Sequence, residues 1–160
     1  MKILQATAAI SLLALSASCS NEAAPAHEER AAMPEAFWST TPMADAVEVL
    51  AAKETPNGQV VVVKGHLQDF GDLATFRLVD SSLPPCADQC ATPWDYCCED
   101  PSDVAAATIN VEFLDGELPA AWSLRGAHGL DHLSVVAVTG TLHTDEAGNA
   151  RLSATSIAKL

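Results

Sequence analysis

From residue 60 to the C-terminus, five segments have the apolar patterns of β-strands, either a buried apolar run or an alternation with a period of two. This period is typical of β-strands, in which successive side chains point to opposite faces of a sheet. It is clearest in the third segment, where Ile109, Val111 and Phe113 occupy every second position. The five predicted strands cover residues 60–68, 74–80, 106–116, 134–144 and 150–160. The chain is therefore predicted to be mainly β.

The order of these strands predicts their arrangement. Three strands, a longer connection at 116–133 and a final hairpin with a loop at 145–149 resemble the order of the OB-fold. Gly65 and Gly140 lie inside predicted strands, where a small barrel must curve tightly. We expect a small five-stranded OB-like barrel, with a generic small β-sandwich as the alternative. The longer connection has room for another short strand or a helical turn.

One helix is predicted before the first strand. Thr41 suits an N-cap and Pro42 the first helical position. Apolar residues then recur at helical spacing, at Met43, Ala46, Val47, Leu50 and Ala51. We assign residues 40–160 to the barrel domain.

Residues 1–18 predict a lipoprotein signal peptide. They begin with Lys2 and continue with an apolar stretch that is too short to span a membrane. Small residues precede Cys19, as they do in bacterial lipoprotein processing sites. This resemblance implies cleavage before Cys19 and attachment of lipid, including palmitate, although Ser16 stands where a large aliphatic residue is usual. An ordinary cleaved signal peptide is the alternative.

Residues 19–39 are rich in Ala, Glu and Pro and predict a flexible acidic linker. A lipid anchor would hold the domain at a membrane without inserting it. The absence of Asp after Cys19 implies, by resemblance to lipoprotein sorting, the periplasmic face of the outer membrane rather than the inner membrane. The expected partners are the membrane, through the anchor only, and an unknown envelope protein or small ligand.

The charge of the chain argues against binding to nucleic acid. The net charge is −13, and the whole chain contains only eight Lys and Arg residues. Such a surface repels a phosphate backbone. We therefore predict no nucleic-acid partner.

The sequence "PPCADQCATPWDYCCEDP" places Cys86, Cys90, Cys97 and Cys98 in an insertion, residues 84–101, between the second and third strands. Thiols of exported proteins oxidise, so two disulfides are the first prediction. A lipidated Cys19 would also leave an even number of thiols. A vicinal Cys97–Cys98 bond would be strained, so each is expected to pair with Cys86 or Cys90.

Two other functions are open to the four cysteines. Four thiolates can bind zinc or copper, although neighbouring cysteines point apart unless the segment turns. Thiol–disulfide redox chemistry is the weaker alternative, because the spacing contains no C-x-x-C and the neighbouring residues are acidic. The primary prediction includes no cofactor.

Two further residue pairs are candidate sites. Trp94 and Tyr96 are two residues apart in the insertion, so both can face one side if the segment is extended. They could cap the barrel end or form an aromatic ligand platform. His128 and His132 are four residues apart, a metal-ligand spacing if the segment is helical. Glycines 126 and 129 favour a loop instead, with both histidines solvated.

The segment "CATPWDYCC", together with the strands that flank it, resembles a group of small, uncharacterised exported bacterial lipoproteins. These share a Cys-x-Thr-Pro-Trp-Asp-Tyr-Cys-Cys segment on an OB-like barrel, and the resemblance covers most of residues 43–160. The resemblance implies an OB-like fold and a location in the cell envelope, and it implies no particular activity. No catalytic motif is present, so we predict a non-enzymatic, lipid-anchored cell-envelope binding or interaction module.

Overall fold

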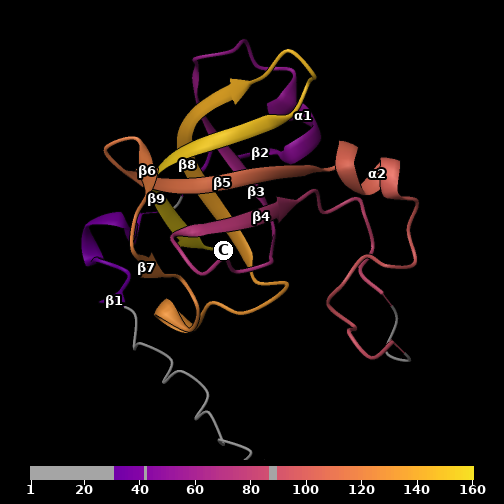
Figure 1. Ribbon diagram of the computed structural model, residues 1–160, viewed down its shortest axis with the longest axis horizontal. Coiled ribbons are helices and arrows are strands. Elements are labelled where there is room, and N and C mark those ends of the chain that lie inside the picture. The colour runs from indigo at the N-terminus through magenta and orange to yellow at the C-terminus, as the bar shows by residue number, and fades with distance from the viewer. Residues whose placement is uncertain (1–30, 42, 87–89) are drawn as a thin grey trace, which may run out of the picture.

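Five strands form a closed barrel in the computed structural model, which describes residues 31–41, 43–86 and 90–160 (Figure 1). The strands pair in the order β3-β4-β5-β9-β8, and β8 pairs again with β3 to close the barrel. Only the β5–β9 pairing is parallel within this ring. The strands are β3 (Val60–Gln68), β4 (Thr75–Val79), β5 (Thr108–Asp115), β8 (Val135–Thr144) and β9 (Ala150–Lys159). The prediction of an OB-like five-stranded barrel is confirmed.

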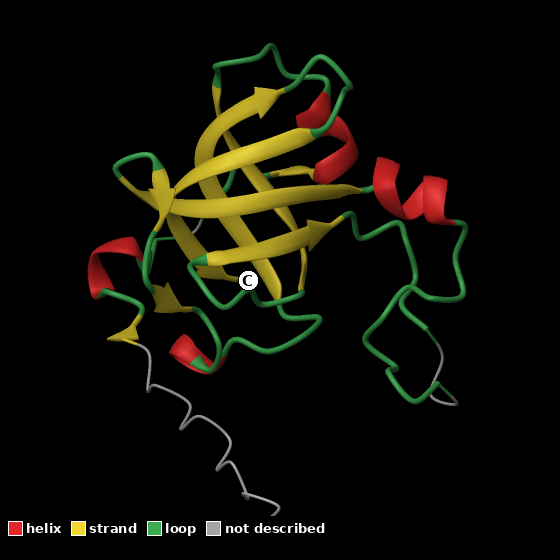
Figure 2. Cartoon of the chain, in the orientation of Figure 1, coloured by secondary structure: helices red, strands yellow, loops and turns green. Residues whose placement is uncertain are grey.

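The connection between β5 and β8 contains the short elements that its length predicted. These are β6 (Leu118–Pro119), β7 (Trp122–Ser123) and the 3-10 helix η2 (Ala127–Gly129). Strand β6 pairs with β5, and β7 pairs with β1 (Ala31–Ala32). Figure 2 shows these elements together at one end of the barrel.

The core extends beyond the barrel into the segment that was predicted to be linker. Phe37, which ends the 3-10 helix η1 (Glu35–Phe37), packs on Phe113 and Trp122 with ring centroids 5.1 and 5.4 Å apart. Met33 is also buried. The folded part of the chain therefore begins before residue 40, because these apolar side chains close the barrel end.

Two glycines allow the barrel strands to approach closely. A Cβ on Gly140 would lie 2.6 Å from the carbonyl oxygen of Ser153, and a Cβ on Gly65 would lie 2.5 Å from that of Val79. The β8–β9 register also shifts between Thr139 and Gly140. Glycine at these positions permits the curvature that a small barrel needs.

The predicted N-terminal helix is much shorter than expected. Helix α1 spans Val49–Lys53, and the two residues before it form β2 (Val47–Glu48), which pairs in parallel with β3. The predicted apolar stripe is wrong, because Val49 and Ala52 are buried whereas Leu50 is exposed. Pro42 lies outside the described residues.

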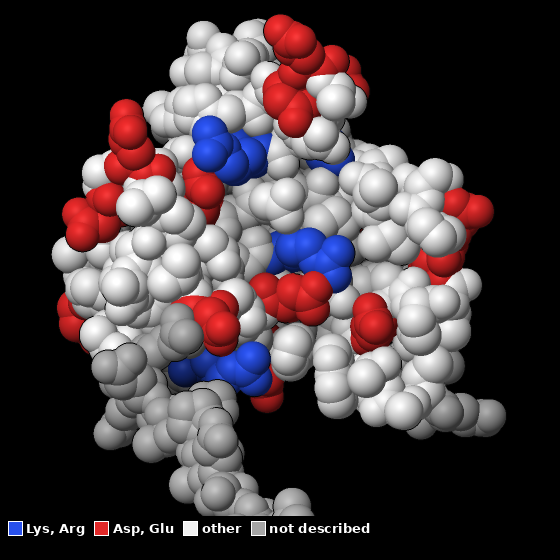
Figure 3. Space-filling model, viewed as in Figure 1, with Lys and Arg blue, Asp and Glu red and all other residues white. Residues whose placement is uncertain are grey.

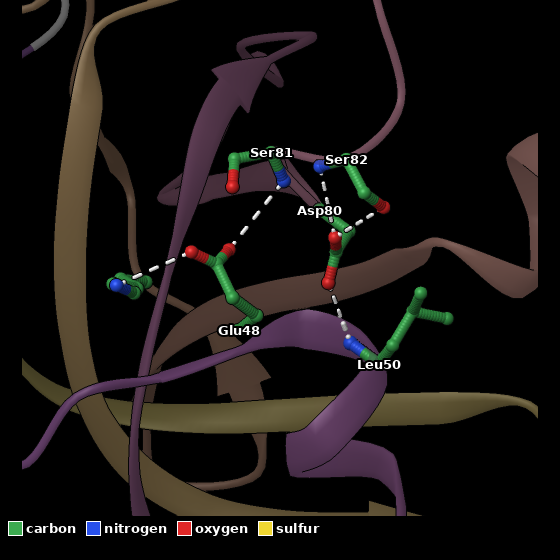
Figure 4. A network of polar contacts seen from close by, with 6 residues as sticks. Glu48, Leu50, Asp80, Ser81 and Ser82 are labelled. Atoms are coloured by element: carbon green, nitrogen blue, oxygen red, sulfur yellow. Dashed lines mark hydrogen bonds and ion pairs between the residues drawn. The ribbon is translucent and has the colours of Figure 1, made fainter.

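A carboxylate that directly follows β4 caps the first turn of α1. Asp80, directly after β4, accepts hydrogen bonds from the backbone N–H of Leu50 at 2.8 Å and from the N–H and hydroxyl of Ser82 (Figure 4). Asp80 is 2% exposed. A helix N-terminus needs acceptors for its free N–H groups, and here a distant residue supplies one.

Helix α2 (Pro101–Ala106) follows the cysteine insertion and was not predicted. Its start has a local cause, because the Asp100 side chain accepts the Ser102 N–H and Pro101 occupies the first turn. Lys53 Nζ donates to the carbonyls of Ala105 and Ala106, which joins α1 to the end of α2. Within the described ranges, no helix has the length and apolarity needed to cross a bilayer.

Candidate functional site

The cysteine loop, residues 84–100, leaves the barrel after β4 and returns through α2 (Figure 1). Its path is folded back by two backbone hydrogen bonds. The Cys86 N–H donates to the Asp95 carbonyl at 2.6 Å, and the Asp95 N–H donates to the Thr92 carbonyl at 2.9 Å. This turn brings Cys86 next to Cys97 and Cys98, although they are far apart along the loop.

The four sulfurs of the loop form one compact group. All four Sγ atoms lie within 4.8 Å of one another. Cys86 Sγ is 3.0 Å from Cys97 Sγ and 3.3 Å from Cys98 Sγ. Cys90 Sγ is 3.6 Å and 3.8 Å from the same two atoms. The turn that joint ligation would require is therefore present.

The sulfur–sulfur distances can be compared with those in a disulfide and in a four-thiolate zinc site. A disulfide has an S–S length of about 2.05 Å, and all four cysteines are unbonded in the structure. Thiolates around a tetrahedral zinc ion, at about 2.3 Å each, are separated by about 3.8 Å. The Cys90 separations of 3.6 and 3.8 Å match this value, whereas the Cys86 separations of 3.0 and 3.3 Å are shorter than it and longer than a disulfide bond. Each of Cys97 and Cys98 also contacts both Cys86 and Cys90, so neither cross-pairing is preferred by distance.

Two side-chain contacts hold the loop against β3. Gln68 Nε2 donates to Asp95 Oδ1 at 3.1 Å, and the Tyr96 hydroxyl lies 3.3 Å from His66 Nδ1. Tyr96 is buried, and burial raises the pKa of its hydroxyl to about 12. Sequence reasoning missed the roles of Gln68, His66 and Asp95, because no local pattern indicates a contact between a strand and a distant loop.

The thiols of the group influence one another's ionisation. Hydrogen bonding from the Cys97 thiol lowers the pKa of Cys86. Donation to Cys86 raises the pKa of both Cys97 and Cys98 to about 11. The thiol whose pKa is lowered is thus the buried one, and the two exposed thiols are among those whose pKa is raised.

The two aromatic residues of the loop lie in different surroundings. Tyr96 is 3% exposed, whereas Trp94 is 39% exposed. The Trp94 ring stacks on His132 with centroids 5.4 Å apart. Trp94 therefore offers the accessible ring of the predicted platform, and Tyr96 anchors the loop.

The structure places His128 and His132 against different partners. His128 stacks on Trp38 at 4.0 Å, and its Nε2 lies 3.3 Å from a Glu35 carboxylate oxygen. Among the residues that the structure describes, the one group of three or more potential metal ligands is the cysteine group. Neither histidine belongs to it. Cys19, the predicted lipidation site, lies outside the described residues.

Comparisons with known proteins show similarity to solved structures and add no function. No family model matches the chain, and no curated protein sequence matches it. Among solved structures, the hypothetical protein ygiW from E. coli is similar over 77% of this chain and 95% of its own, with 13% identity and a TM-score of 0.41. A small single-stranded DNA-binding protein from Streptomyces coelicolor shows 16% identity and a TM-score of 0.33, over 66% of this chain and 96% of its own.

A third similar structure is much longer than this chain. The aspartyl tRNA synthetase from Entamoeba histolytica shows 12% identity and a TM-score of 0.46 over 82% of this chain, which corresponds to 26% of the synthetase. At these identities the likeness concerns the fold alone.

Proposed function

We propose that this protein is a lipid-anchored, non-enzymatic binding module of the cell envelope whose cysteine loop holds a thiophilic metal ion, Zn²⁺ or Cu(I). The observation that carries the metal proposal is the convergence of the four Sγ atoms within 4.8 Å. Four thiolates from one loop are a sufficient ligand set for either ion.

The way in which the loop is held supports this function. Cys86 is buried at the base of the group, whereas Cys97 and Cys98 are exposed. The contacts of Asp95 and Tyr96 with β3 fix the residues that precede Cys97. The barrel therefore orders one side of the ligand set, and the other side is open for a metal ion to enter.

Two disulfides are the competing state of the same four sulfurs. We expect full-length protein, extracted with detergent from the oxidising compartment without reductant, to contain about one zinc or copper ion per chain. Four reactive thiols should appear after chelation. Elemental analysis combined with thiol titration measures both quantities.

The same assay separates the alternatives. Two disulfides would give neither thiols nor bound metal, which would reject the metal proposal and support the disulfide prediction. Four free thiols without metal, and without uptake of added Zn²⁺ or Cu(I), would reject both.

Attachment of the protein to the membrane is tested independently. Cys19→Ala is expected to move the protein from the membrane to the soluble fraction, or to leave it unprocessed, because the lipid acceptor is lost. Fractionation and intact mass measure the result, with Ser20→Ala as the control. A Cys19→Ala protein that is processed and membrane-bound like the original would show that the anchor lies elsewhere.

A further inference from the structure

The hydrophobic core of the barrel is separate from the cysteine loop. Among the residues that the structure describes, the buried apolar side chains that form this core lie outside residues 84–100. Cys86 and Tyr96 are buried, but they do not belong to the core. In small domains with a structural zinc ion, the binding energy of the ion drives folding. This barrel has a core of its own, so its fold does not need an ion in the loop.

The contacts that hold the loop in place do not use a sulfur atom. They are the side-chain contacts of Asp95 with Gln68 and of Tyr96 with His66, and the backbone hydrogen bonds of Cys86 and Asp95. An exchange of the ligands around a metal ion leaves these contacts intact. The four sulfurs can therefore remain within 4.8 Å of one another while an ion enters or leaves.

The four thiols differ in their exposure to solvent. Cys86 is 6% exposed and Cys90 is half-buried, whereas Cys97 and Cys98 are exposed. Structural zinc sites are closed, but catalytic zinc sites, where the ion takes on new ligands, keep an open position. Cys97 also lines a hollow of about 500 Å³ whose wall includes residues of α2. An incoming ligand can therefore reach a bound ion from the side of Cys97 and Cys98.

The loop and α2 give this side of the molecule a negative charge. All charged residues from 84 to 106 are acidic, namely Asp88, Asp95, Glu99, Asp100 and Asp103. Figure 3 shows carboxylates on the part of the surface that α2 and the loop form. A negative potential slows the approach of anions and speeds that of cations, most strongly at low ionic strength. The cysteine group is therefore more accessible to an incoming ligand that is neutral or positive.

We propose that the ion held by the cysteine group is cargo, which is transferred to a neutral or basic acceptor that presents two thiols. The inference rests on the proposed metal site and names the chemistry of its partner. A thiolate of the acceptor binds the ion, and the bond between the ion and Cys97 or Cys98 breaks. The acceptor thiol loses its proton and the released cysteine takes one up, so the total charge and the oxidation states do not change. Repetition of this exchange at the other sulfurs releases the ion.

Transfer to a small dithiol tests the proposal. Full-length protein in detergent is loaded with Zn²⁺ or Cu(I), whichever it binds, mixed with excess dimercaptopropanol, and desalted at intervals for elemental analysis. The rate of metal loss should rise in proportion to the dithiol concentration, because the dithiol attacks the bound ion. The anionic dithiol dimercaptosuccinate should act more slowly, and added salt should reduce the difference. The circular dichroism of the strands should be unchanged after transfer.

Matched substitutions on α2 test the route to Cys97. Ala105 lines the hollow, whereas its neighbour Ala106 does not, and both are exposed. Ala105→Trp should slow the transfer several-fold, because the indole ring narrows the approach to Cys97. Ala106→Trp adds the same ring to the same helix and should leave the rate unchanged.

Three results would overturn the inference. The first is a rate of metal loss that is independent of the dithiol concentration, as expected of a closed site that releases its ion spontaneously. The second is faster transfer to the anionic dithiol than to the neutral one. The third is an equal rate in the two tryptophan variants. Each of these is measured on protein that holds metal, so the proposed metal site would stand. Protein that takes up neither ion would reject both the metal site and its role in transfer.

Discussion

Cys86→Ser is expected to lower the zinc affinity of the protein at least 100-fold, or about 2.7 kcal/mol. Cys86 is the buried member of the sulfur group and contacts both Cys97 and Cys98. A serine hydroxyl at this position cannot replace the thiolate, and the remaining three sulfurs no longer surround the ion. Competition with a chromophoric chelator measures the affinity.

The matched control for this substitution is Ala91→Ser. It places the same hydroxyl in the exposed part of the loop, next to Cys90, and should leave zinc affinity unchanged. The barrel should survive in both variants, because its core strands do not depend on the loop, so the circular dichroism of the strands should be retained. An unchanged zinc affinity in Cys86→Ser would remove this cysteine from the ligand set.

Asp80→Ala is expected to destabilise the domain by about 2–3 kcal/mol. The substitution leaves the Leu50 N–H and the Ser82 N–H and hydroxyl without their shared acceptor. The site is buried, so water does not replace the carboxylate freely. Helix α1 should fray first, because its N-terminus loses its cap. Chemical denaturation measures the loss, with exposed Asp115→Ala as a control expected to stay within about 0.5 kcal/mol.

The loss in Asp80→Ala should depend on pH. Burial by itself raises the pKa of the Asp80 carboxyl, but hydrogen bonds from Leu50 and Ser82 outweigh it and lower the pKa below its ordinary value of 3.8. A carboxyl with a depressed folded pKa stabilises the fold fully above the unfolded pKa, and this contribution is lost as the pH falls through the folded pKa. The difference between the original and variant proteins should therefore be constant at pH 5–8 and shrink below about pH 4. A difference that does not begin to shrink as the pH falls below 3.8 would show that the carboxylate charge is not its source.

Local pattern was sufficient for the barrel strands. The alternation of Ile109, Val111 and Phe113 predicted β5, and all three are buried in the core. The internal glycines were also correctly interpreted, because a Cβ at Gly65 or Gly140 would collide with the neighbouring strand. Strand periodicity depends on which face is buried, and in a small barrel every strand has one inner face.

Tertiary contacts determined where helix α1 begins, which the local sequence pattern did not predict correctly. Helix α1 begins at Val49 because Asp80 caps it from 30 residues away and because β2 pairs with β3, whereas helical spacing alone predicted a start near Thr41. Helix propensity is weak over five residues, so these contacts outweigh it.

For the candidate sites as well, the sequence identified the residues and the tertiary structure determined their arrangement. Sequence by itself identified the four cysteines, since residue type and clustering carry that information. Their convergence depends on the turn at Asp95 and its contact with Gln68. The contact of Tyr96 with His66 is likewise invisible in the sequence, because a loop and a strand meet there only in the tertiary structure. Strand pairing brings together residues that are distant along the chain, and no local interaction encodes that proximity.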